Sequence, residues 1–167
     1  EDNSLKYYLA QALSIRAFDY FVLAQMYQHT YKGNESKPCV PLITNENANE
    51  AAANGCARST VKEVYDQIMS DLNKAVSLLE ATDKTRGTDK RYISKEVAYG
   101  LRARVNLTMQ NWTAAAEDAQ KAISGSGAPY SREEAGAPGF TESSDHSWMW
   151  AIIIAETDRV VTSGIVN

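Results

Sequence analysis

Two cysteines are the residues of this sequence best suited to covalent chemistry. Cys39 and Cys56 lie in one long segment that separates two expected helices. A disulfide between them would close a loop of 18 residues, which stabilises a fold by about 3 kcal/mol in the chain-entropy model. Two reduced thiols fit the sequence equally well. A metal site is disfavoured, because His29 and His146 do not stand at ligand spacing.

The sequence contains no recognisable catalytic pattern. It has no G-x-S-x-G, H-E-x-x-H, P-loop or C-x-x-C motif. Glu133 and Glu134 are neighbouring carboxylates, but neighbours in a loop do not specify the separation that a glycosidase needs. We therefore expect a protein that is not an enzyme and that holds no cofactor and no metal ion.

The composition indicates a globular protein of one main domain. The 167 residues are 44% hydrophobic and 23% charged. The net charge of −4 argues against nucleic acid as a partner, because phosphate binding needs a basic surface. The longest apolar run, 148–155, is far shorter than the roughly 20 residues that span a bilayer. The sequence opens at Glu1 without a signal peptide, and we expect it to be a piece of a longer protein.

Apolar spacing predicts two long helices in the first half of the sequence. Between Ser4 and Thr30, apolar residues recur at steps of three and four. A second helix begins at Thr60, where Thr60 and Glu63 form a capping box and an apolar stripe then continues to Leu79. Three charged residues fall largely off this stripe and are expected on a solvated face: Asp66, Asp71 and Lys74.

The stretch 94–123 predicts two further helices joined by a tight turn, with Ser94 as the first cap. Three small residues in it stand 12 and then 7 positions apart: Ala103, Ala115 and Ala122. This spacing resembles that of a tetratricopeptide repeat, in which small side chains let antiparallel helices approach closely. Ala24 has the corresponding place in the first helix, and Trp112 is expected to cover the turn. An unrelated helical hairpin would fit the same spacing.

Two segments are expected to be irregular. Residues 32–59 form a long, ordered connection that contains two prolines and an Asn- and Ala-rich stretch. Residues 131–144 are rich in Gly, Pro and Ser and predict a loop. The following run, 148–154, is dense in aromatic and β-branched residues and predicts a buried strand with Trp148 and Trp150 on one face.

The expected fold is mainly α, with tetratricopeptide-like antiparallel helix pairs, a long loop between helices and a short C-terminal strand or loop segment. We place a helical domain at residues 1–124. Residues 125–167 would begin an irregular subdomain that is mostly absent from this sequence.

Five segments, taken in order, carry a resemblance to a known family. They are R-A-F-x-Y-F-x-L-A-x-x-Y at 16–27, V-P-L-I-T at 40–44, R-S-T-V-x-E-V-Y-x-x-I-x-x-D-L at 58–72, S-K-x-x-A at 94–98, and A-R-V-x-L at 103–107. Together they resemble the SusD/RagB family of outer-membrane lipoproteins of Bacteroidetes, over about residues 16–123.

The resemblance implies a function that composition and spacing do not. Members of this family are non-catalytic proteins of the cell surface, tethered by a lipidated N-terminal cysteine. They bind glycans or other nutrients and act as the lid of a SusC-like TonB-dependent transporter. Neither cysteine of this sequence follows a signal peptide, so the lipid anchor is expected outside it. The alternative is a tetratricopeptide-type scaffold that binds another protein in a concave groove.

Three aromatic residues are candidates for contact with a sugar ring. Flat rings beside hydrogen-bonding groups stack on the C–H faces of sugars. Tyr31 stands at a helix end, Tyr130 in a Gly- and Pro-rich loop, and Trp148 beside a turn rich in Ser and Asp. Ordinary packing in the core or in loops is the competing interpretation of each. The family's own platform residues cannot be transferred to this sequence by motif.

Overall fold

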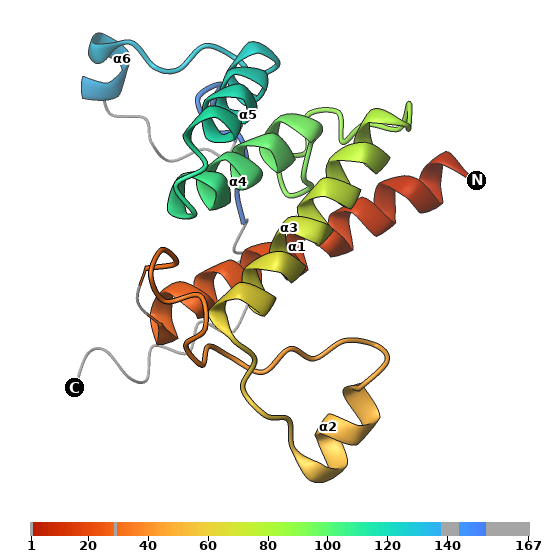
Figure 1. Cartoon of the computed structure of the whole chain (residues 1–167). Helices are drawn as coiled ribbons and strands as arrows, with labels where there is room; N and C mark the ends of the chain where they lie inside the picture. The colour runs from red at the N-terminus through yellow and green to blue at the C-terminus, as the bar shows by residue number, and fades with distance from the viewer. Residues whose placement is uncertain (1, 29, 138–143, 153–167) are drawn as a thin grey trace, which may run out of the picture.

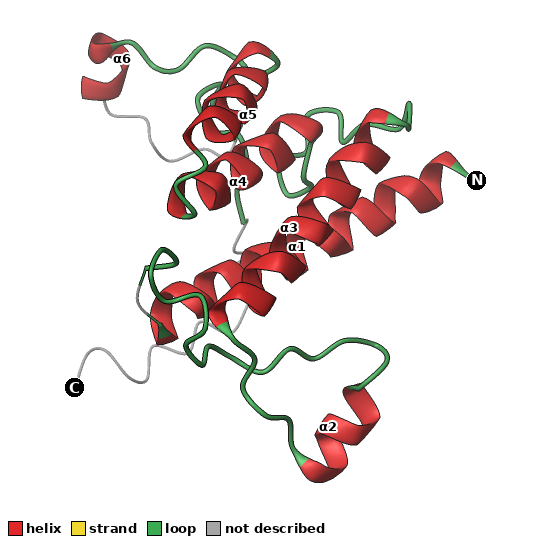
Figure 2. Cartoon of the chain, in the orientation of Figure 1, coloured by secondary structure: helices red, strands yellow, loops and turns green. Residues whose placement is uncertain are grey.

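Two long antiparallel helices form the centre of the fold (Figure 1). In this computed structural model, which describes residues 2–28, 30–137 and 144–152, helix α1 is Asn3–Tyr27 and helix α3 is Val61–Glu80. A second antiparallel pair, α4 (Lys95–Thr108) and α5 (Trp112–Ser124), packs beside them mainly through α4 and α3. The prediction of a mainly helical fold built from paired helices is confirmed (Figure 2).

A line of small side chains lets α1 approach α3. Ala10, Ala17 and Ala24 are spaced seven residues apart on α1, and all three are buried. Side chains seven residues apart lie on one face of a helix. The large buried residues of α3, among them Ile68 and Leu72, belong to the same core. The interface between α1 and α3, called the seam below, therefore pairs small residues of α1 with large residues of α3. This pairing allows the two helices to pack closely.

The start of α3 agrees with the sequence prediction. The Thr60 hydroxyl accepts a hydrogen bond from the Glu63 amide at 3.2 Å, and the Thr60 amide donates to the Glu63 carboxylate at 2.7 Å. This capping box satisfies two backbone N–H groups that a helix start otherwise leaves open. The predicted apolar stripe of α3 is buried from Val61 to Leu79.

Asp71 is not solvated, contrary to the prediction for this face of α3. Its exposed fraction is only 3%. Its two carboxylate oxygens accept hydrogen bonds from Nε and Nη2 of Arg16, each at 2.7 Å. Gln67 donates a third at 2.9 Å. The expectation of a solvated residue was wrong, because an arginine on the neighbouring helix supplies the partner that a buried carboxylate requires.

The hairpin of α4 and α5 confirms the small-residue spacing. Ala103, Ala115 and Ala122 are all buried. The turn between the helices passes through Gln110, whose φ of 64° lies in the left-handed region. Trp112 begins α5 and has an exposed fraction of 61%, and the expectation that its ring covers the turn stays a prediction.

The expected irregular segments contain two short helices that the sequence did not predict. Helix α2 (Ala48–Asn54) stands on the long connection between α1 and α3 and buries no residue. Helix α6 (Arg132–Gly136) lies in the predicted Gly- and Pro-rich loop, where Ser131 and Glu134 form a second capping box. Short capped turns of this kind form locally and need no core.

The predicted buried strand is not formed over residues 148–152. Ile152 has an exposed fraction of 82%, and the Ala151 amide donates a hydrogen bond to the Lys90 carbonyl at 3.1 Å. Residues 153 and 154 of that prediction lie outside the described residues. Segment 144–151 instead lies against the helical part, with Met149 and Trp150 packed on the core. The boundary at residue 124 stays a prediction.

The seam between α1 and α3 yields a stability test at Ala24. We expect Ala24→Leu to lower the free energy of unfolding by about 1–3 kcal/mol, because extra methyl groups overfill a packed core. Urea denaturation measures this change. Ala12→Leu is the matched control, since Ala12 is exposed on the same helix, and it should change stability by less than about 0.5 kcal/mol. Equal losses of unfolding free energy in the two variants would contradict close packing of Ala24 at the seam.

Candidate functional site

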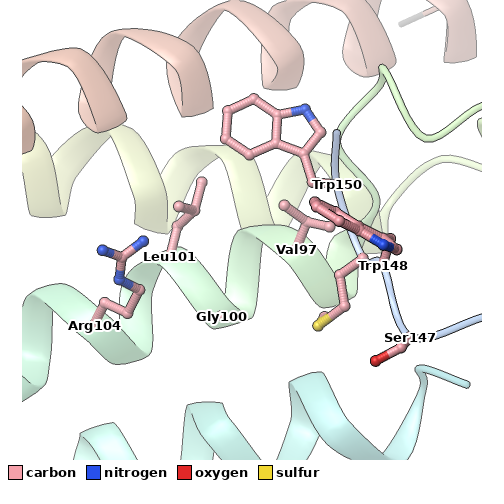
Figure 3. A pocket seen from close by; sticks show the side chains of 8 residues that line it. Val97, Gly100, Leu101, Arg104, Ser147, Trp148 and Trp150 are labelled. Atoms are coloured by element: carbon pink, nitrogen blue, oxygen red, sulfur yellow. The ribbon is translucent and has the colours of Figure 1, made fainter. Parts of the chain in front are cut away.

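A hollow of about 470 Å³ lies between α4 and residues 147–150 (Figure 3). Helix α4 contributes one wall through four residues that share a face: Val97, Gly100, Leu101 and Arg104. The opposite wall is formed by Ser147, Trp148, Met149 and Trp150. The spacing of three and four along α4 is the reason that its four residues line one side.

The two tryptophans of this hollow differ in their role. The Trp150 indole packs edge-on against Phe18, with ring centroids 5.3 Å apart, and its Nε1 donates to the Arg91 carbonyl at 3.1 Å. Trp148 is exposed over 38% of its surface. Trp150 therefore fixes the segment on the core, and Trp148 is the ring that a ligand can reach.

The loop between α3 and α4 clamps residues 144–151 in place. Arg86 donates from Nη1 to the Tyr92 carbonyl at 2.9 Å and to the Met149 carbonyl at 2.6 Å. Lys90 donates to the carbonyls of Ser144, at 3.2 Å, and Asp145. Burial lowers the pKa of the Arg86 guanidinium from its usual value, although the group stays charged at any ordinary pH. Hydrogen bonds from charged donors are among the stronger ones in proteins.

Arg104 supplies the charge of the hollow. Its side chain is exposed on α4, and its guanidinium carbon lies 6.0 Å from the Phe21 ring centroid. Within the described residues it forms no ion pair with a carboxylate. A flat indole, an apolar floor and a guanidinium donor together suit a ligand with an apolar face and polar edges, such as a sugar ring.

The structure separates Tyr31 from the other two aromatic residues that the sequence singled out, Tyr130 and Trp148. Tyr130 lies next to the wall of the hollow, because its amide donates to the Ser147 hydroxyl at 3.4 Å. A hydrogen bond to Asp145 raises the pKa of Tyr130 to about 12. Tyr31 lies elsewhere, with its ring 4.9 Å from that of Tyr65 in the core, and burial raises its pKa. Tyr31 and Trp148 are therefore not brought together.

Sequence reasoning missed Arg104 and Leu101 as residues that line a site. The available signal was the helical spacing of Val97, Leu101 and Arg104. That spacing identifies a face, but not the segment that will cover it.

The two cysteines are free thiols in the structure. Cys39 is buried, and burial raises the pKa of its thiol. Cys56 is half-buried, with its Sγ 3.7 Å from the Leu42 carbonyl oxygen. Over the described residues, no group of acidic, His or Cys side chains could hold a metal ion. None of the described helices is long and apolar enough to cross a membrane.

A family model described as "Starch-binding associating with outer membrane" (SusD-like) matches residues 1–107. A SusD-like carbohydrate-binding protein from Bacteroides vulgatus superposes with a TM-score of 0.79 at 27% identity, over 90% of this chain and 31% of its own. A SusD superfamily protein from Bacteroides thetaiotaomicron gives a TM-score of 0.67 at 26% identity, over 80% of this chain and 28% of its own.

A laminarin-binding SusD-like protein gives a TM-score of 0.59 at 26% identity, over 77% of this chain and 25% of its own. No curated protein matches this chain. The chain thus spans about a third or less of the length of the solved structures that it resembles.

The clamp on residues 144–151 can be tested at Arg86. We expect Arg86→Ala to reduce the free energy that holds this segment against the helices by about 2 kcal/mol, since the Met149 carbonyl loses a charged donor. Acrylamide quenching of Trp148 and Trp150 should then increase. The measurement uses a Trp112→Phe background, which removes the exposed third indole.

Arg132→Ala is the control for this experiment. Arg132 is exposed on α6 and has no ion pair or hydrogen bond of its side chain within the described residues. Its removal should leave the quenching unchanged. Quenching that stays unchanged in Arg86→Ala as well would mean that Arg86 does not hold the segment.

Proposed function

This chain belongs to the SusD-like family, and we propose from that premise that it is part of a non-catalytic glycan- or nutrient-binding protein of the cell surface. The proposal includes an outer-membrane location, a lipid anchor on the full-length protein and a SusC-like TonB-dependent transporter as partner. The SusD-like protein would act as the lid of that transporter. The family model, described as starch-binding and associating with the outer membrane, supports the glycan ligand and the location. The lipid anchor, the transporter partner and the lid role rest on the resemblance of the sequence to the SusD/RagB family.

The observation that carries glycan binding is the exposed Trp148 ring, which lines the same hollow as Arg104 (Figure 3). An indole offers a flat apolar surface to the C–H face of a sugar, and a guanidinium donates to its hydroxyl groups. Leu101 and Val97 provide an apolar floor, which excludes water from the stacked face. Such an arrangement binds and orients a sugar. It contains no pair of carboxylates that would hydrolyse one.

The binding test compares two tryptophan variants. We expect Trp148→Ala to weaken binding of laminarin- or starch-derived oligosaccharides by about 2 kcal/mol, a roughly thirtyfold rise in Kd. Isothermal titration calorimetry measures the affinities. Trp112→Ala is the matched control, because Trp112 is exposed on α5 and lies outside the hollow. Equal affinity in the two variants would exclude Trp148 from the site.

A second candidate function, a protein-binding scaffold, is favoured by an apolar groove on the α4–α5 hairpin. The groove has a volume of about 450 Å³. Alanines line it, and three large apolar side chains at its edges are exposed: Leu107, Trp112 and Ile123. A contiguous apolar surface of this kind is typical of a protein-contact site.

The two functions respond to different variants. Ala116 lies in the groove and is exposed, so Ala116→Glu should disrupt a protein contact there through an added charge. It should leave sugar affinity intact. Purification of the full-length protein from its own membranes tests the transporter. Recovery of a TonB-dependent β-barrel supports the lid proposal, and a full-length protein that binds neither a barrel nor any glycan contradicts it.

A further inference from the structure

A second hollow, of about 320 Å³, lies where the start of α1, the α3–α4 loop and the start of α4 meet. It shares no lining residue with the Trp148 hollow. Its wall carries three cationic side chains, Lys84, Arg86 and Lys95, and one carboxylate, Glu96. The local charge is therefore positive, in a protein whose net charge is −4.

The wall of this hollow contains a buried tyrosine whose hydroxyl forms no hydrogen bond within the described residues. Tyr7 has an exposed fraction of 3%, and its hydroxyl has no hydrogen-bond partner among the described residues. A buried polar group without a partner destabilises the fold, and such groups are rare in proteins. Burial raises the pKa of Tyr7, so at neutral pH the hydroxyl is protonated and can donate.

The start of α4 adds two more donors. The Ser94 hydroxyl accepts from the Val97 amide at 3.3 Å. Within the described residues, the amides of Lys95 and Glu96 have no acceptor. The first amides of a helix carry partial positive charge and bind anions. The residues that carry these two amides therefore line the same hollow as the cations and Tyr7.

Lys84 is held at the rim by neighbours that do not neutralise it. Its ammonium group lies 3.3 Å from the hydroxyls of Ser4 and Tyr8, and 4.3 Å from the Tyr8 ring centroid. Hydroxyl groups and an aromatic face position a cation while leaving its charge for a ligand. The carboxylate of Glu96 offsets only one of the three cations.

We propose that this hollow binds the carboxylate of a small hydroxylated molecule, with a uronic acid as the representative ligand. The carboxylate would meet the amides of α4 and Lys84, and the Tyr7 hydroxyl would donate to the same ligand. The volume exceeds what a carboxylate alone fills, and the Tyr7 ring and Leu79 offer apolar contact to a sugar ring. The proposal does not depend on sugar binding at Trp148.

The test titrates the 167-residue protein with sodium glucuronate at constant ionic strength and follows its amide NMR signals. The Lys95 and Glu96 signals should shift along a saturable curve, and neutral glucose should leave them unmoved. Tyr7→Phe should raise the Kd for glucuronate about tenfold, since one hydrogen bond to a charged acceptor is lost. Its melting temperature should not fall, because the variant removes an unsatisfied group.

Tyr27→Phe is the matched control, because Tyr27 is exposed near the other end of α1, and it should bind as the parent protein does. Lys84→Met should also weaken binding about tenfold and reduce its salt dependence. Trp148→Ala should leave glucuronate binding intact, which separates this site from the proposed glycan site.

Several results would overturn the proposal. The first is the absence of a saturable shift up to about 10 mM glucuronate, where even weak sites become occupied. The second is an unchanged Kd in Tyr7→Phe, which would mean that the hydroxyl meets no ligand. The third is inorganic sulfate that binds as tightly as glucuronate, because a plain anion site does not recognise the sugar.

Discussion

The close approach of two helices is the constraint on which this structure depends. The side chains of Ala10, Ala17 and Ala24 are small enough to bring the α1 backbone against α3, and all three are buried. Because the helices are so near, Arg16 on α1 reaches Asp71 on α3 with two hydrogen bonds of 2.7 Å. A buried carboxylate is tolerated only when such a partner is fixed in place.

The second helix pair, α4 and α5, also combines small residues with an ion pair between its two helices. Arg102 on α4 donates to both carboxylate oxygens of Asp118 on α5, at 2.8 and 2.7 Å. Asn106 adds a third donor to the same carboxylate at 3.3 Å. In each pair a forked arginine on the first helix meets an aspartate on the second, beside a line of alanines. Small residues thus set the helix distance, and the ion pair fixes the register of the two helices.

The candidate sites lie where loops meet this helical frame. The loop between α3 and α4 borders the second hollow and also holds residues 144–151 beside the first. Arg86 belongs to both arrangements, since it lines the second hollow and donates to the Met149 carbonyl. In many proteins a rigid scaffold positions the loops, and the loops carry the functional groups.

The sequence by itself determined the local features. The Thr60 capping box, the helix faces and the alanines at the crossings follow from spacing along the chain, and five ordered segments identified the family. Only the tertiary structure decided that Asp71 is buried, that residues 148–152 are no strand, and that Trp148 and Arg104 share a hollow. Each of these depends on partners far along the chain, such as Arg16 and Asp71, which stand 55 positions apart. Periodicity reports which face of an element is apolar, whereas the neighbour of that face is set by how the helices pack.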